Sequence, residues 1–341
     1  MLLPWLVCSS IGWAGEPPLF VRSAAMQYDG ERHAAFDALT GTTGTSVHAP
    51  IPGERVATIP DSAVRDDRES EPAETERTRP LRLRPPWGAP KVLRGGSSSA
   101  EDRKAAIDKL ELQTLPEDRR VRAMCVVDRL SVYRRLPTIS FSAAPEVYRY
   151  FLTVPHAAVD IWRALDVSEF RLWPDGKERF RAAASDGSRG QLLVLRRRED
   201  SVLVFCEGQY VSPLLPKPIL ARALIHLQFV FRDGETAEPT IIHTADLFVS
   251  LPSQPVETVA RVIAPISNLI ADRNFEEVTQ FVQMMDYAMR RQPAWVRQLS
   301  TRLQTVSATD LQAFLMTTQR IHVRHRAAAA RTSAKSMQRQ R

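Results

Sequence analysis

The side chain with the clearest chemical potential in this sequence is His243, which stands among apolar residues. Ile241, His243 and Ala245 alternate with Thr240 and Thr244. A period of two places alternate side chains on one face of a strand, so the imidazole is expected on the apolar face. A buried imidazole needs a hydrogen-bond partner, and it becomes a base when a carboxylate orients it. His243 is therefore either a group that holds or polarises a ligand, or a core histidine with a satisfied ring.

Glu207 and Tyr210 lie near the end of another predicted strand, directly before the proline-rich loop Val211–Leu220. Proline cannot donate to a strand ladder, so this loop belongs at a rim or edge of the sheet. In one interpretation, both residues line the mouth of a cavity, and Glu207 acts as an acid, a base or a group that orients a ligand. In the other, Glu207 pairs with an arginine of Arg196–Arg198 on the neighbouring strand.

Polar residues interrupt the apolar patterns at two further places. Asp272, Arg273 and Asn274 stand in the middle of a long apolar helix pattern, where buried polar groups need partners. Either a ligand in a pocket supplies those partners, or a kink turns the segment outward. His226 and Asp246 share the predicted outer, water-facing side of neighbouring strands, where a cross-strand pair is a modest stabiliser.

Catalytic and cofactor motifs are absent from the sequence. It contains no HExxH, no P-loop, no GxGxxG after a strand, no GxSxG and no CxxC. The three cysteines, Cys8, Cys125 and Cys206, therefore indicate plain thiols rather than a disulfide framework or a metal site. His322 and His325 stand three apart in a basic segment, which favours at most non-specific chelation. The sequence indicates no cofactor and no metal.

Alternating patterns predict the strands that would position these side chains. The two longest patterns are separated by Asp233-Gly234, a dipeptide typical of a hairpin turn. Each has one apolar face, which is expected to meet the core or a cavity. The predicted strands are Thr138–Phe141, Glu169–Trp173, Lys177–Ala184, Gly190–Arg198, Ser201–Tyr210, Ala221–Arg232 and Thr240–Leu251.

Apolar residues at helical spacing predict a long helix near the C-terminus, Val256–Arg291, with a kink at Pro265. Met285 lies on its apolar face. Prolines open several shorter helices, because a missing N–H costs nothing in the first turn. These helices are Glu146–Thr153, Ala157–Leu165 and Pro293–Gln304. A further helix is predicted over Ala308–Ala330, with Ser307 and Asp310 as its cap.

The chain of 341 residues changes composition along its length. Residues 1–15 are short and apolar, which fits either a signal peptide or an inert N-terminus, so an exported and a cytoplasmic location stay equally open. Residues 16–113 are rich in proline, glycine and charge and are predicted to be a disordered leader. Thr114 and Glu117 have capping-box spacing and open a helix predicted over 114–136.

The positive charge of the sequence resides in its C-terminus, a helical extension over 292–330 and a basic tail over 331–341. Arg320–Arg341 holds seven Lys or Arg and no acid, which leaves 39 of the 46 basic residues against 39 acidic ones elsewhere. Charge alone can bring this segment to a weak anionic partner. Without aromatic residues it favours no base stacking, so no specific nucleic-acid binding is expected. The alternative is a solvated helix end that frays.

Between Thr138 and Arg291 the predictions give one strand, two short helices, six antiparallel strands and one long helix. This order resembles the START-like superfamily, also called SRPBCC or polyketide-cyclase-like. The resemblance implies an α+β domain over 137–291, a helix-grip-like curved antiparallel sheet of six to seven strands around a long C-terminal helix, with extra helices at both ends. Some segments are also similar to uncharacterised bacterial proteins of the planctomycete type: Tyr150–His156, Ile161-Trp162, Glu207–Pro216 and Asp272–Phe275.

The resemblance implies an apolar cavity between sheet and helix. The predicted function is non-catalytic binding of an apolar, lipid-like small molecule there, driven by about 25 cal/mol per Å² of buried surface. The alternative is a structural or interaction module of the cell envelope with a filled core, and a lesser one is a cyclase- or hydrolase-type enzyme using His243. No apolar run is long enough to predict a membrane span. The residues predicted to contact the ligand are Ile225, Leu227, Phe229, Phe231, His243, Leu247, Met285, Glu207 and Tyr210.

Overall fold

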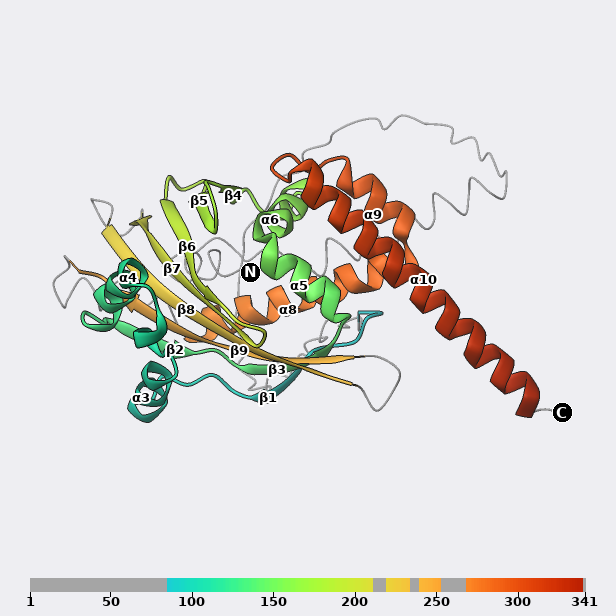
Figure 1. Cartoon of the computed structure of the whole chain (residues 1–341), viewed down its shortest axis with the longest axis horizontal. Coiled ribbons are helices and arrows are strands. Elements are labelled where there is room, and N and C mark those ends of the chain that lie inside the picture. Colours follow the sequence, from blue (N-terminus) through green and yellow to red (C-terminus); the bar gives the residue numbers. More distant parts are fainter. Residues whose placement is uncertain (1–84, 211–218, 234–238, 253–267, 340–341) are drawn as a thin grey trace, which may run out of the picture. The chain divides into compact units, whose positions relative to one another are not determined.

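The computed structural model describes residues 85–210, 219–233, 239–252 and 268–339. The predicted signal peptide, most of the predicted leader, most of the proline-rich loop and the predicted kink at Pro265 lie outside these residues. Within them, helices cover both faces of one open, curved antiparallel sheet, which confirms the α+β class (Figure 1).

Nine strands form the sheet in the described part of the chain. All their pairings are antiparallel, and the number exceeds the six to seven predicted strands because two strands come from segments expected to be a leader and a helix. The strands are β1 (Lys91–Arg94), β2 (Val132–Arg135), β3 (Thr138–Ser142), β4 (Arg171–Pro174), β5 (Arg179–Ala183), β6 (Arg189–Arg197), β7 (Ser201–Tyr210), β8 (Ile219–Arg232) and β9 (Thr240–Ser250). Their order is β1-β3-β9-β8-β7-β6-β5-β4, and β2 also pairs with β9.

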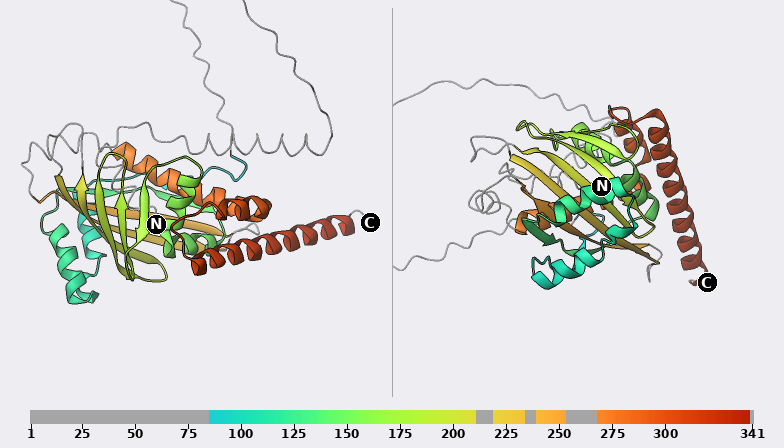
Figure 2. Two further views of the ribbon diagram at one scale, coloured as in Figure 1. Left: turned by 90° about the horizontal axis from the view of Figure 1, so that it is seen from above. Right: turned by 60° about the vertical axis from the view of Figure 1, so that its left-hand side comes forward.

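The helices divide between the two faces of this sheet (Figures 1 and 2). Prolines occupy the first turn of three of them, as predicted. The helices are α3 (Ala100–Asp108), the 3₁₀ turn η1 (Leu112–Thr114), α4 (Glu117–Val127), α5 (Pro145–Thr153), α6 (Pro155–Ala164), α8 (Asn268–Arg291), α9 (Pro293–Ser300) and α10 (Ala308–Arg339).

The inner face of the sheet carries Ile225 and Leu247 and packs against α5, α6 and α8. Its residues are the apolar members of the predicted alternation, so the sequence predicted this face correctly. Met285 of α8 lies in the same buried cluster. The large core of the domain therefore lies between the sheet and these helices.

The outer face carries Leu224 and Phe248 and packs against α3, η1 and α4. The prediction that this face meets water is wrong here, because a second apolar cluster covers it. Leu203 and Phe205 of β7 belong to that cluster, so β7 is apolar on both faces where they lie. A strand apolar on both faces is typical of a sheet with a layer on each side.

Residues 85–136 differ from the predicted leader and helix. Ser99 accepts a hydrogen bond from the backbone of Asp102 at 3.1 Å and starts α3 inside the predicted leader. The predicted helix over 114–136 is shorter than expected: α4 ends at Val127, and Val132–Arg135 forms β2. Val132–Arg135 are extended because they pair with β9. This pairing joins segments more than 100 residues apart, so the helical spacing of nearby residues does not predict it.

The C-terminal helices follow the prediction more closely. Ser307 Oγ accepts from the backbone N–H of Asp310 at 3.1 Å, which confirms the predicted N-cap of α10. Helix α10 continues to Arg339, so the basic segment is helical where fraying was expected. Its last turns extend away from the sheet (Figure 2), and the described side chains there are exposed.

Candidate functional site

His243 of β9 lies in a three-residue hydrogen-bond relay between the sheet, α5 and α8. Its Nδ1 lies 3.1 Å from the Tyr148 hydroxyl, and its Nε2 lies 2.9 Å from the Thr279 hydroxyl. Thr279 donates its own proton to the Phe275 carbonyl at 2.8 Å. Thr279 can therefore only accept from the ring, so Nε2 carries the proton and Tyr148 donates to Nδ1. Both ring nitrogens are satisfied.

The surroundings of His243 keep its ring neutral. The side chain is 3% exposed and stacks on Phe275 with ring centroids 4.4 Å apart. Burial lowers the pKa of His243 to about 3. No described carboxylate bonds to the ring, so the requirement for an activated base is not met. The geometry matches the interpretation of a core histidine.

Aromatic rings fill the part of the inner face around His243. Phe229 and Phe231 both lie edge-on to Tyr148, at centroid distances of 5.3 and 6.0 Å. The Arg149 guanidinium covers Phe231 at 4.3 Å from its centroid. The remaining apolar residues of the predicted site also lie inside this core: Ile225, Leu227, Leu247 and Met285.

Glu207 lies on the other face of the sheet from His243. It neighbours Phe205 of the outer cluster, and its carboxylate pairs with Arg222 of β8 at 2.5 Å rather than with Arg196–Arg198 of β6. Both strands flank β7, and alternation alone does not choose between them. Tyr210 ends β7, and its side chain lies outside the described residues. Glu207 thus cannot orient a molecule on the inner face.

The polar residues of α8 find partners within the protein. Asp272 forms an ion pair with Arg134 of β2, with Arg134 Nε 3.1 Å from Oδ1. Arg273 pairs with Glu277 one helical turn later, at 3.1 Å. Asn274 is buried. The ion pair with β2 therefore accounts for Asp272, and an exposed pair within α8 accounts for Arg273.

Small residues form a continuous row on the inner face, away from the aromatic part. Ala182, Gly190, Gly208 and Ala221 are cross-strand partners in turn, from β5 to β8. The two glycines let β6 and β7 approach closely, since a Cβ on Gly208 would lie 2.9 Å from the Cα of Gly190. Across four strands, no side chain in this small-residue row is larger than a methyl group.

His156 of α6 lies beside the next row. Its ring centroid is 5.9 Å from that of Phe180, the cross-strand partner of Leu192, which pairs in turn with Cys206. The side chain is 5% exposed, and neither ring nitrogen has a hydrogen-bond partner among the described residues. Burial lowers the pKa of His156, although the Asp310 carboxylate opposes this shift.

The position of His156 in the sequence indicates where it lies in its helix, although strand alternation says nothing about it. A histidine directly after the proline that opens a helix lies in the first turn. Its burial, however, depends on the contact with Phe180 in a strand 24 residues later, a contact that no local pattern encodes.

Comparisons with known proteins leave the family of this chain open. No protein-family model matches the sequence, and no curated protein matches it. A conserved protein from Geobacillus kaustophilus is similar in structure at 12% identity and a TM-score of 0.31, covering 44% of this chain and 92% of that one. The Mll3558 protein from Rhizobium loti is similar at 12% identity and a TM-score of 0.26, covering 41% of this chain and 97% of that one. An uncharacterised protein from Rhizobium leguminosarum is similar at 11% identity and a TM-score of 0.22, covering 41% of this chain and 95% of that one. At these TM-scores the similarity supports no argument about fold or function.

Two further properties concern the described residues only. None of their helices combines the length and apolarity needed to cross a membrane. Within the same ranges, no group of three or more His, Cys, Asp or Glu is placed to hold a metal ion.

Proposed function

We propose that this protein binds an apolar small molecule without transforming it, on the inner face of the sheet beside α6. The fold would then be a variant of the helix-grip fold of the START-like superfamily, with α8 as the gripped helix. The ligand would lie over the small-residue row, away from the aromatic part of the core to which the sequence assigned it.

The observation that carries this proposal is the small-residue row. Ala182, Gly190, Gly208 and Ala221 offer a wall without bulky side chains, while the neighbouring part of the same face is filled by rings. An apolar ligand buried on such a wall gains about 0.8 kcal/mol per CH₂ group removed from water. Ligand sites are commonly apolar walls with a few polar groups that fix orientation.

His156 is the polar group that would fix the orientation of the ligand. A neutral imidazole offers one donor and one acceptor, which matches a hydroxyl group. The carboxylates of Asp160 and Asp310 act on this ring. They disfavour an anionic group there, so the ligand is expected to be a neutral molecule with a hydroxyl at one end, such as a long-chain alcohol.

Native mass spectrometry of the full chain, repeated under denaturing conditions, tests this function. A bound ligand gives an extra mass of a few hundred daltons that disappears on denaturation. Ala221→Leu extends a side chain over the small-residue row and should abolish the extra mass without loss of stability. Ala245→Leu is the matched control, because both alanines are buried on the same face and Ala245 lies outside the small-residue row.

Three observations together would contradict ligand binding at the small-residue row. If wild-type protein shows no extra mass, does not gain stability from long-chain alcohols, and loses as much stability from Ala221→Leu as from Ala245→Leu, the wall is packed. A small-to-large change in a packed core costs about 1–3 kcal/mol. The interaction-module alternative would then replace the binding function.

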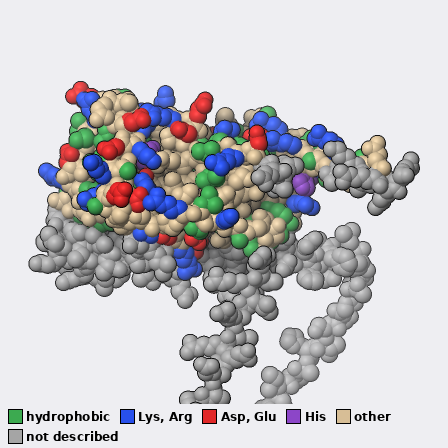
Figure 3. Space-filling model, turned by 90° about the horizontal axis from the view of Figure 1, so that it is seen from below, with side chains coloured by type: hydrophobic (Ala, Val, Ile, Leu, Met, Phe, Trp, Pro, Cys, Tyr) green, Lys and Arg blue, Asp and Glu red, His purple; other side chains and the backbone are tan. Residues whose placement is uncertain are grey.

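Helix α10 favours that second candidate function. Figure 3 shows Lys and Arg side chains with almost no acidic ones at the end of the surface where α10 runs. Val323 is 58% exposed, and only basic charges follow it in the sequence. Anionic vesicles test this contact: binding should fall with salt and vanish when residues 327–341 are removed. Salt-independent binding would contradict it.

A further inference from the structure

Two nitrogen atoms buried on the outer face have no hydrogen-bond partner within the described ranges. They are Nδ1 of His226 in β8 and Nη2 of Arg196 in β6. The His226 side chain is 4% exposed. A guanidinium N–H without an acceptor is costly away from water, because the group is charged. Unpaired groups of this kind indicate an occupant with acceptor atoms.

The strand register places both side chains over one short stretch of sheet. Arg196 pairs with Leu203, Leu203 with His226, and His226 with Asp246. Adjacent strands lie about 4.8 Å apart, so the Cα atoms of Arg196 and His226 are separated by about 10 Å. An irregularity in β6 between Val194 and Arg196 turns the arginine toward the outer face.

The turn η1 and the residue before it hold one side of the Arg196 guanidinium. Nη1 donates to the Thr114 hydroxyl at 3.0 Å and to the Glu111 carbonyl at 3.4 Å. Glu111 has a φ of 46°, a left-handed conformation that is uncommon for a residue with a side chain. The group is thus positioned through Nη1, while the buried Nη2 has no acceptor among the described residues.

Cations and carboxylates both surround this stretch: Glu111 and Asp200 act on Arg196, but the Glu111 carboxylate is already paired with Arg198. Burial lowers the pKa of His226 to about 4, and the neighbouring cations Arg196, Lys109 and Arg198 add to this shift. Asp246 acts in the opposite direction, but its carboxylate already accepts from Arg135. An anion bound here would offset the repulsion among these cations and accept from the free N–H groups.

We propose that Arg196 and His226 bind a small oxyanion of the sulfate or phosphate type between the outer face of the sheet and η1. The guanidinium supplies its two unused Nη2 protons, and the imidazole supplies an N–H at Nδ1. This oxyanion site lies on the opposite face from the small-residue row, so either site can fail without the other.

Thermal unfolding of the full chain with sulfate tests the oxyanion site. Sodium chloride at matched ionic strength serves as the reference, because sulfate also stabilises proteins non-specifically. Wild type should show a rise in Tm beyond that of the chloride reference, growing with the logarithm of sulfate concentration once that concentration exceeds Kd. Arg196→Met should weaken the affinity at least tenfold, whereas Arg181→Met, which changes an exposed arginine, should leave it unchanged. Equal sulfate responses in wild type and Arg196→Met would overturn the proposal.

Selenate provides a test that needs no variant to fold. It has the shape and charge of sulfate, and its selenium scatters anomalously. Crystals of the wild-type protein soaked in selenate should give a peak within hydrogen-bond distance of Arg196 Nη2 and His226 Nδ1. A refined water in that place, or no density, overturns the proposal.

Discussion

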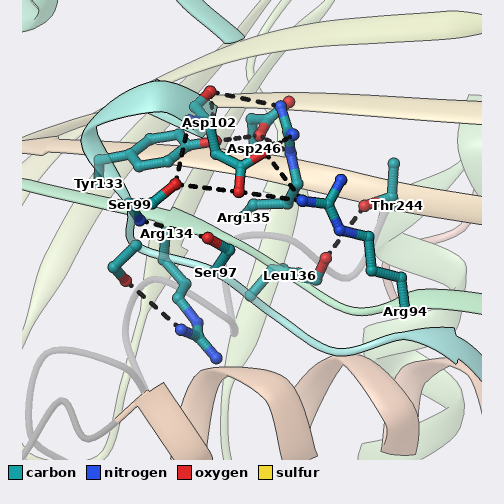
Figure 4. Close-up of polar contacts among 11 residues, drawn as sticks. Arg94, Ser97, Ser99, Asp102, Tyr133, Arg134, Arg135, Leu136, Thr244 and Asp246 are labelled. Atoms are coloured by element: carbon teal, nitrogen blue, oxygen red, sulfur yellow. Dashed lines mark hydrogen bonds and ion pairs between the residues drawn. The ribbon is translucent and has the colours of Figure 1, made fainter. Parts of the chain in front are cut away.

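Arg135 donates from Nε to Oδ1 of Asp246 at 2.9 Å, beneath α3 on the outer face of the sheet. Asp246 is fully buried, and it also accepts from the Tyr133 hydroxyl at 2.7 Å (Figure 4). Gln228 Nε2 donates to its second oxygen at 3.1 Å. Asp102 of α3 binds the same guanidinium. These contacts join β2 and α3 to β9, so both elements that were predicted as leader and helix belong to the folded domain.

Replacing Arg135 by methionine should lower the free energy of unfolding by about 3–5 kcal/mol, because Asp246 would keep a buried charge without its cation. Urea unfolding measures the change. Arg181→Met is the matched control, since Arg181 and Asp175 form an exposed pair worth less than about 1 kcal/mol. If both variants lost the same free energy of unfolding, the buried network would stabilise the fold no more than an exposed ion pair does.

Acid should destabilise the protein partly through His243. The pKa of this ring is about 3 in the folded protein against 6.5 ordinarily, so between these values the unfolded chain binds the extra proton. Stability is therefore full above pH 6.5 and falls toward pH 3, by at most about 1.4 kcal/mol per pH unit. His243→Gln keeps a donor and an acceptor but cannot titrate, and urea unfolding from pH 7 to 4.5 should show a shallower fall. An unchanged slope would contradict this assignment.

Gly96→Ala should destabilise the contact between β2 and α8. A Cβ at this position would lie 2.7 and 2.8 Å from the Asp272 carboxylate oxygens, beside their ion pair with Arg134. Moving that pair should cost about 1–3 kcal/mol. Gly95→Ala meets nothing within 4 Å and should stay within about 0.5 kcal/mol of wild type in thermal unfolding. Equal changes in stability for Gly96→Ala and Gly95→Ala would contradict the predicted crowding at Gly96.

Helix α10 should be separable into a structural and a dispensable part. Ending the chain after Arg326 removes only side chains that are exposed where described, so Tm should shift by no more than a degree or two. Phe314→Ala, in contrast, opens a cavity at a fully buried ring that contacts Phe151, and should cost about 3–5 kcal/mol. A large loss on truncation would mean that the last turns stabilise the fold.

Local periodicity determined much of the secondary structure. Strand β7 has the predicted bounds, Ser201–Tyr210, and the prolines at 145, 155 and 293 begin helices as expected. These features depend on neighbours a few residues apart, where alternation and φ restrictions act directly. The same local rules placed His243 on the apolar face, and its burial is as predicted.

Only the tertiary structure decided which groups meet. His243 takes its partners from positions 95 and 36 residues away, Tyr148 and Thr279, and these contacts make it a satisfied core residue. The small-residue row and the unpaired nitrogens of Arg196 and His156 depend on strand register and on helix docking. Periodicity fixes the face of a strand that a residue occupies, but the partner across that face is chosen by packing between segments far apart in the chain.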